Sequence, residues 1–115
     1  MSSNAGLRIG LAGACGRGGS FQRVLDCMQG ACVQAVCDIN EADLHQAALR
    51  HGASEEYLDY EAMLEQSELD AVVVGTPMPF HVPQAIVALQ RGIHVLSEVP
   101  AGVSLEECRD LTVAC

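Results

Sequence analysis

The sequence of 115 residues contains no lysine and no tryptophan, and only two phenylalanines and two tyrosines. Its six basic residues are all arginines and face fifteen acidic residues, which gives a net charge of −9 at pH 7. Nucleic acids and anionic membranes are bound by clustered cations, and unpaired bases stack on aromatic side chains. The composition therefore argues against a nucleic-acid partner and against a membrane surface.

Long apolar runs are also missing, although half of the residues are hydrophobic. The longest apolar run is much shorter than the roughly 20 residues of a membrane-spanning helix. The opening residues, MSSNAG, lack the basic flank and apolar core of a signal peptide. A cytoplasmic location is therefore expected.

The six cysteines include no Cys-x-x-Cys pair, and the four histidines show no ligand spacing with them. In a core-rich chain without a signal pattern, such cysteines are expected to be reduced and to pack as small hydrophobic residues. We expect neither a disulfide framework nor a metal site.

The most informative feature present is a glycine-rich loop, GACGRG, over residues 13–18. The apolar run 7–12 before it predicts a central strand, and a second apolar run, 32–37, ends at Asp38, twenty residues beyond the loop. Between them, one helix face is predicted by the i, i+3, i+4, i+7 spacing of Phe21, Val24, Leu25 and Met28.

This strand–turn–helix–strand order predicts a dinucleotide site. The glycines allow the backbone to approach the pyrophosphate, the helix N-terminus offers N–H groups, and Asp38 would hold the adenine ribose hydroxyls. The alternative is a glycine turn that only lets the elements pack closely.

Helix and strand patterns alternate along the rest of the chain. The first half predicts a helix from an Asn40 cap to Gly52 with Leu44, Ala47 and Ala48 inward, an edge strand within 57–60, and helical turns around Met63 and Leu64. The second half predicts strands over 71–74 and 93–96, a helix from Pro83 to Gly92 with Ile86 and Leu89 buried, and a helix with a Ser104–Glu107 capping box and Leu105, Cys108 and Leu111 inward. Such alternation predicts a doubly wound parallel sheet, a Rossmann-type single domain over residues 1–115.

Three later segments carry a more specific pattern. These are 68–77, which contains Asp-Ala-Val and ends in Thr-Pro, then His81, and then 92–100, which reads GIHVLSEVP. In order and spacing they resemble the N-terminal NAD(P)-binding domain of the Gfo/Idh/MocA oxidoreductases, the family of glucose–fructose oxidoreductase and inositol dehydrogenase. The resemblance extends from about residue 7 to the C-terminus.

The resemblance implies a cofactor cleft at the C-terminal ends of the strands. In it the loop would line the pyrophosphate, Asp38 would bind the adenine ribose, and Glu98 would lie beside the nicotinamide ribose. The implied cofactor-binding residues are Gly13, Cys15, Gly16, Arg17, Gly18, Asp38, Thr76, Pro77, His81 and Glu98. NAD is expected in preference to NADP, because Asp38 would face the 2′-phosphate. The structural alternatives are a simple Thr76-Pro77 turn, a His81 satisfied by a backbone carbonyl, and an exposed Glu98.

The chain departs from the family pattern in three ways. Cys15 stands at the middle glycine of the fingerprint, and Val99 stands where the family has a lysine that assists proton transfer. The family's second domain, which holds the substrate, is absent from these 115 residues. The last helix has no terminal glycine or proline, so we expect a chain cut from a longer one, with a natural single domain as the alternative.

Two functions remain open from the sequence. The first is the NAD-binding domain of a dehydrogenase of a sugar, polyol or related hydroxy compound, inactive as this chain alone because no catalytic residue stands at Val99. The second is a non-catalytic nucleotide-binding or redox-sensing module. In either case the apolar surface that a second domain would cover is expected to make the chain self-associate.

Overall fold

The computed structural model describes residues 6–115. Residues 1–5, which belong to the opening segment without a signal pattern, lie outside the described residues. The elements are β1 (Leu7–Ala12), η1 (Arg17–Phe21), α1 (Gln22–Asp26), β2 (Ala31–Cys37), α2 (Glu41–His51), β3 (Glu55–Tyr57), α3 (Tyr60–Gln66), β4 (Ala71–Val74), η2 (Met78–Phe80), α4 (His81–Gln90), β5 (His94–Ser97) and α5 (Leu105–Ala114).

The five strands form one parallel sheet in the order β3-β2-β1-β4-β5. β1 lies at its centre, where Leu11 pairs with Val36 of β2 and with Val73 of β4. Because the chain moves outward from β1 first to one side and then to the other, the strand order reverses between β1 and β4. The predicted doubly wound Rossmann-type fold is confirmed.

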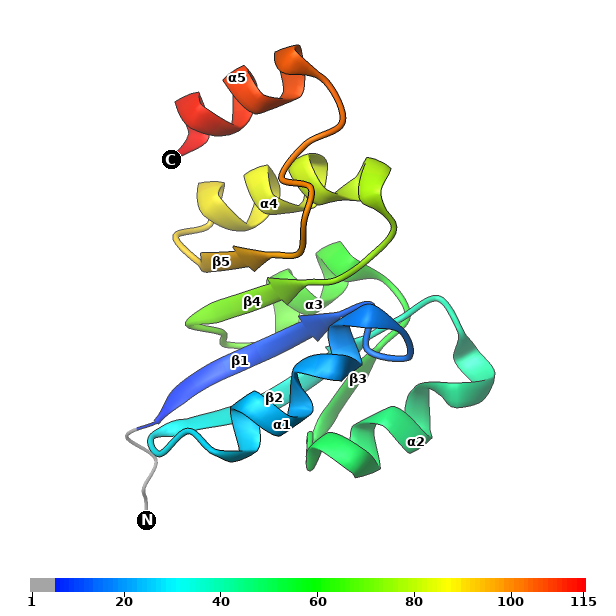
Figure 1. Cartoon of the computed structure of the whole chain (residues 1–115). Coiled ribbons are helices and arrows are strands. Elements are labelled where there is room, and N and C mark those ends of the chain that lie inside the picture. Colours follow the sequence, from blue (N-terminus) through cyan, green and yellow to red (C-terminus); the bar gives the residue numbers. More distant parts are fainter. Residues whose placement is uncertain (1–5) are drawn as a thin grey trace.

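Helices cover both faces of the sheet (Figure 1). On one face, Leu11 and Val36 pack against Leu44 and Ala47 of α2, together with residues of η1 and α1. On the other face, Val72 and Val74 pack against α3 and α4. This double coverage explains the continuous apolar strand 71–74, as expected for parallel sheets. No helix among residues 6–115 is long and apolar enough to cross a membrane.

α2 follows its prediction closely. The Asn40 side chain accepts a hydrogen bond from the backbone N–H of Asp43 at 3.3 Å, and Leu44 and Ala47 are buried. Gly52 ends the helix in the left-handed conformation, with φ of 67°, where glycine carries no Cβ penalty.

The helix after the glycine loop is shorter than predicted. It opens as the 3-10 turn η1 and continues only to Asp26, so Met28 lies beyond it and is exposed, as is Val24. Phe21 and Leu25 do pack against the core. The reason is the tight return to the sheet, in which the N–H of Leu7 donates to the carbonyl of Gly30 at 2.6 Å. Residues 27–30 must therefore form a turn.

Three other predictions are corrected in part. The edge strand is 55–57 and not 57–60, because Asp59 caps α3 by accepting a bond from the N–H of Ala62 at 3.0 Å. α4 begins at His81, before Pro83, and buries Val82, Ala85 and Ala88, whereas Ile86 and Leu89 are only half-buried.

α5 is the third correction. Ser104 accepts the predicted capping bond from the N–H of Glu107 at 3.1 Å. Leu105, however, is 70% exposed, and Cys108 and Leu111 are only half-buried. α5 lies outside α4, away from the sheet, so only part of its apolar face finds a partner in this chain (Figure 1).

Candidate functional site

A cleft of about 670 Å³ lies at the C-terminal ends of β1, β2 and β4. This edge, beside the point where the strand order reverses, is where open α/β sheets bind ligands. The cleft is lined by Ala12, Gly13, Cys15, Gly16, Arg17, Cys37, Asp38, Ile39, Asn40, Leu58, Asp59, Tyr60, Gly75, Thr76, Pro77, Phe80 and Gln84.

The glycines of the loop have different roles. A Cβ at Gly13 would lie 2.5 Å from the carbonyl oxygen of Gly75, and one at Gly18 would lie 2.4 Å from that of Ala12. These two glycines are therefore required by the protein's own packing. Apart from its chain neighbours, a Cβ at Gly16 would meet nothing closer than 3.9 Å, so packing does not require glycine there. Gly16 leaves open space on the cleft wall, which suits a close ligand.

Most backbone N–H groups of the loop already have acceptors within the protein. Those of residues 13 and 14 donate to the carbonyl of Cys37, and those of residues 16 and 18 donate to the carbonyl of Gly13. The N–H of Cys15 donates to the carboxylate of Asp38 at 2.9 Å. The loop also carries a positive charge into the cleft lining, on the side chain of Arg17.

Asp38 follows β2 and lines the cleft, as the sequence predicts. Its carboxylate accepts bonds from the N–H groups of Cys15 and Asn40, both at 2.9 Å. These two bonds fix the carboxylate between the glycine loop and the start of α2.

Cys15 also lines the cleft, but its side chain is half-buried and packs against the core under α2. Its Sγ lies 4.0 Å from the carbonyl oxygen of Asn40. Burial, together with the negative charge of Asp38, raises the pKa of the Cys15 thiol. The thiol is therefore protonated at neutral pH and acts as a small apolar group.

A second hollow of about 600 Å³ adjoins the cleft and is lined by Arg17, Thr76, Pro77, Met78, Pro79, His81, Glu98 and Val99. Arg17, Thr76 and Pro77 line both spaces. The structure thus brings all ten sequence-predicted cofactor residues to one edge of the sheet. Of these, Gly18 is buried beneath the loop and lines neither space.

His81 is fully buried at the start of α4. Its Nδ1 lies 2.8 Å from the carbonyl oxygen of Pro100, and its Nε2 lies 2.7 Å from that of Thr76. The ring therefore connects the loop after β4 to the loop after β5. Both ring nitrogens thus have backbone carbonyl partners, which is the structural alternative that the sequence left open. His81 also borders the second hollow.

Glu98 follows β5 and is largely shielded, with 17% of its side chain exposed. Its carboxylate accepts a bond from the N–H of Val99 at 2.9 Å and forms an ion pair with the guanidinium of Arg17. The Val99 N–H and, next to it, the Arg17 side chain lower the pKa of Glu98 below its ordinary value. Glu98 is therefore an ionised group at this site and not a freely exposed acid.

Sequence reasoning missed Tyr60 and Gln84. The hydroxyl of Tyr60 donates to the carbonyl of Gln84 at 2.8 Å, and the hydroxyl of Thr76 donates to the Gln84 side-chain oxygen at 2.6 Å. Tyr60 is the first residue of α3 and Gln84 is a half-buried residue inside α4, and no local sequence pattern marks either as part of a site. Only the packing of α3 and α4 beside the cleft brings them to Thr76.

Comparison with known proteins adds independent evidence. A protein-family model described as "Oxidoreductase family, NAD-binding Rossmann fold" matches residues 7–115. A relative named glycosyl hydrolase family 109 protein, from Solibacter usitatus, is 32% identical over 94% of this chain and 27% of its own length. The chain thus spans about a quarter of the length of such relatives.

Solved structures agree with this match. Scyllo-inositol dehydrogenase from Lactobacillus casei, determined with NAD(H) and scyllo-inositol, superposes with a TM-score of 0.87 at 29% identity, covering 95% of this chain and 32% of that one. The WlbA dehydrogenase from Bordetella pertussis, determined with NADH and UDP-GlcNAcA, superposes with a TM-score of 0.88 at 31% identity, covering 96% and 34%.

Proposed function

The chain belongs to the Gfo/Idh/MocA oxidoreductase family and carries its NAD-binding Rossmann fold, and from this premise we propose that it is the cofactor-binding part of a dehydrogenase. The substrate class we propose is a sugar, polyol or related hydroxy compound. Similarity to an inositol dehydrogenase and to WlbA, whose structures hold a polyol and a sugar nucleotide, supports this class.

The arrangement of the site supports a specific placement of the cofactor. The adenine ribose would lie against the fixed Asp38 carboxylate, and the pyrophosphate would pass Gly16, the one loop glycine with open space before it. The nicotinamide half would lie in the second hollow, between Thr76-Pro77 and Glu98. When bound, NAD would supply the hydride chemistry, and these residues would hold and orient it.

The chain itself supplies no group for proton transfer at the family's lysine position. Val99 is 78% exposed at the mouth of the second hollow and has no titratable group. We therefore propose that substrate binding and proton transfer need residues outside this chain, such as a second domain. A non-catalytic nucleotide-binding or redox-sensing module is the alternative that Val99 favours.

The name of the Solibacter relative supports a second candidate, a glycoside hydrolase. Some glycosidases depend on NAD, so an NAD-binding domain fits this activity as well as a dehydrogenase. A substrate assay on the complete protein distinguishes them, because a dehydrogenase accumulates NADH and a hydrolase releases free sugar without net change in NAD.

We also propose that the chain works in the cytoplasm and self-associates. All six cysteines are free, as expected in a reducing compartment, and Leu105 and Val113 of α5 are exposed. Light scattering tests the second point, since a monomer at high concentration would contradict it.

The observation that carries the proposal is the open cleft wall at Gly16. We expect Gly16→Ala to weaken NAD binding about tenfold in calorimetric titration, because its methyl group would enter the space before the pyrophosphate. The thermal midpoint should change little, since apart from the chain neighbours the nearest atom to the added carbon, the Gly13 carbonyl oxygen, lies 3.9 Å away. Absence of NAD binding by the wild type, or equal affinity in the stable variant, would contradict the proposed placement.

A further inference from the structure

Arg17 crosses the boundary between the two hollows. It belongs to the glycine loop, yet its guanidinium pairs with Glu98 after β5, 81 residues further along the chain. Arg17 lines both hollows, whereas Glu98 lines only the second. A dinucleotide that fills both spaces, as the proposed function requires, must therefore pass beside this ion pair.

Arg17 is the group at the glycine loop that is best able to bind a phosphate. The N–H groups of residues 13–16 and 18 already donate within the protein. Arg17 is also the one arginine among the described residues that line the two hollows, and the sequence has no lysine. A phosphate that enters here thus meets one permanent positive charge, the Arg17 guanidinium, which is already paired with the Glu98 carboxylate.

The two partners are held in ways that allow separation. The Arg17 side chain is 61% exposed, and its guanidinium has two further contacts, with Nη1 3.0 Å from the Ser20 hydroxyl and Cζ 5.6 Å from the centre of the Phe21 ring. Glu98 keeps the N–H of Val99 as a donor if Arg17 leaves. Neither charge would be left without a partner.

We propose that Arg17 exchanges partners when the cofactor binds. In the free domain it pairs with Glu98, and in the complex it pairs with the pyrophosphate, which leaves the Glu98 carboxylate to accept bonds from the second ribose. Glu98 therefore competes with phosphate for Arg17 while it contributes to ribose binding. This inference rests on the proposed function. It predicts the direction of one change in affinity: removing the Glu98 charge strengthens the binding of a diphosphate that lacks the second ribose.

ADP is the ligand that isolates this effect, because it carries the diphosphate and the adenosine but no second ribose. By calorimetric titration we expect Glu98→Gln to bind ADP about three- to fivefold more tightly than the wild type, the range of an exposed ion pair. Arg17→Gln should bind ADP about tenfold more weakly, because a charge-assisted bond to phosphate is lost. In the Arg17→Gln background, Glu98→Gln should have no further effect.

Two matched controls separate this exchange from the general loss of charge. Glu65→Gln and Arg23→Gln change the same charges at exposed positions on α3 and α1, and each should alter ADP affinity less than twofold. Circular dichroism confirms that each variant is folded. In addition, the Nε–Hε NMR signal of wild-type Arg17 should move on saturation with ADP.

Several results would overturn the inference. These are unchanged or weaker ADP binding by Glu98→Gln, an equal gain in Glu65→Gln, or an Arg17 signal that stays in place at saturating ADP. A wild type that binds NAD together with any of these contradicts the exchange alone. A wild type that binds neither ADP nor NAD contradicts the proposed function, and the exchange with it.

Discussion

At the residue scale, Cys15 is the departure that bears most directly on cofactor binding. The family pattern has glycine here, and in this chain the Cys15 side chain lines the cleft while its Sγ lies beside the carbonyl of Asn40. Cys15→Gly is expected to tighten NAD binding by up to about tenfold, because the wall beside the pyrophosphate would be backbone alone.

Calorimetric titration of both proteins measures this difference. Equal affinity would show that the side-chain orientation toward Asn40 already clears the cleft. Weaker binding by the glycine variant would show that the loop depends on cysteine for its path.

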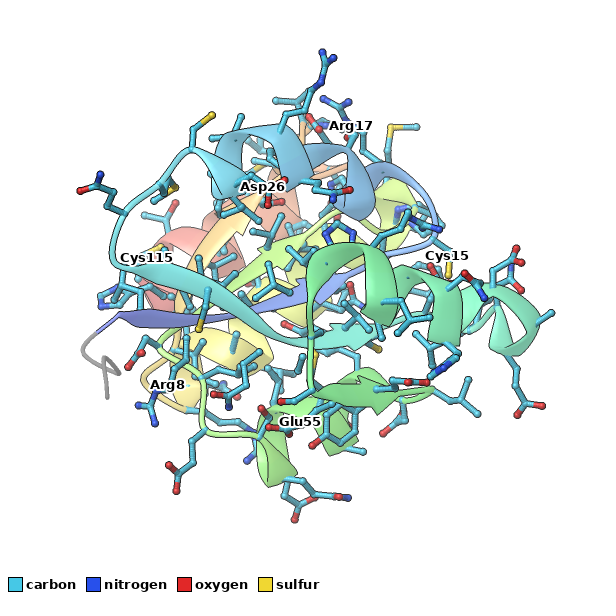
Figure 2. All side chains as sticks on the ribbon, turned by 90° about the horizontal axis from the view of Figure 1, so that it is seen from below. Arg8, Cys15, Arg17, Asp26, Glu55 and Cys115 are labelled. Carbon is cyan, nitrogen blue, oxygen red and sulfur yellow. The ribbon has the colours of Figure 1, made fainter. Side chains whose placement is uncertain are left out.

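Asp70 is the residue whose charge most clearly supports the sheet, at the end opposite to the site (Figure 2 shows Arg8 and Cys15 at opposite ends of the molecule). Its carboxylate accepts bonds from the backbone N–H of Arg8 at 2.8 Å and from its Nε and Nη2 at 3.1 Å. The Arg8 side chain and then its backbone N–H lower the pKa of Asp70 from 3.8 to about 2.

A lowered folded-state pKa means that the ionised carboxylate stabilises the fold above the unfolded pKa of 3.8, and that this contribution is lost as pH falls toward 2. Asp70→Asn should therefore lower the free energy of unfolding at pH 7, and its difference from the wild type should shrink between pH 4 and pH 2. Urea denaturation across this range measures it. A difference that stays constant with pH would contradict the assignment.

Single residues were predictable from the sequence where a motif marks them and not where only the fold brings them together. Asp38 and Glu98 each come shortly after an apolar run that predicts a strand, so the sequence marks both. The pairing of Arg17 with Glu98 joins residues 81 apart, and the contact of Gln84 with Thr76 depends on how α4 approaches β4. No local spacing encodes either contact.

At the element scale, α2 offers a test that separates stability from binding. The Asn40 side chain caps α2, whereas the Asn40 backbone N–H donates to Asp38. Asn40→Ala removes the cap and keeps the backbone bond, so we expect a loss of about 1 kcal/mol in the free energy of unfolding. NAD affinity should change less than stability does, because the backbone N–H that fixes Asp38 is kept, although the Asn40 side chain also lines the cleft. Urea denaturation and calorimetry measure the two effects, and an unchanged stability would contradict the capping role.

The bounds of a helix or strand were predictable where burial of its own residues determines them. β1 and β4 have the bounds that their apolar runs predict, because both strands are covered on both faces. The helix after the glycine loop was predicted too long, because periodicity cannot show where the chain must turn back to start β2. The inward face predicted for α5 was wrong at Leu105, because helix periodicity does not show how much of that face the chain itself can cover.

At the scale of the whole molecule, the site is confined to one edge of a strongly acidic domain. We expect these 115 residues by themselves to show no dehydrogenase turnover on sugars or polyols, because they include no lysine that could assist proton transfer. Absorbance at the NADH band measures turnover, with NAD binding by the same sample as the control. Substrate-dependent formation of NADH would contradict this expectation.

The most direct test of NAD binding at this cleft is calorimetric titration of the wild-type chain with NAD and with NADP. The N–H groups of Cys15 and Asn40 hold the Asp38 carboxylate in place. In this position its negative charge would face the 2′-phosphate of NADP. Two like charges about 4 Å apart repel by about 4 kcal/mol at an effective dielectric constant of about 20, before salt screening. NAD should therefore bind at least about tenfold more tightly than NADP. Equal or tighter binding of NADP, or no binding of either, would contradict the assignment of Asp38 and of the cleft.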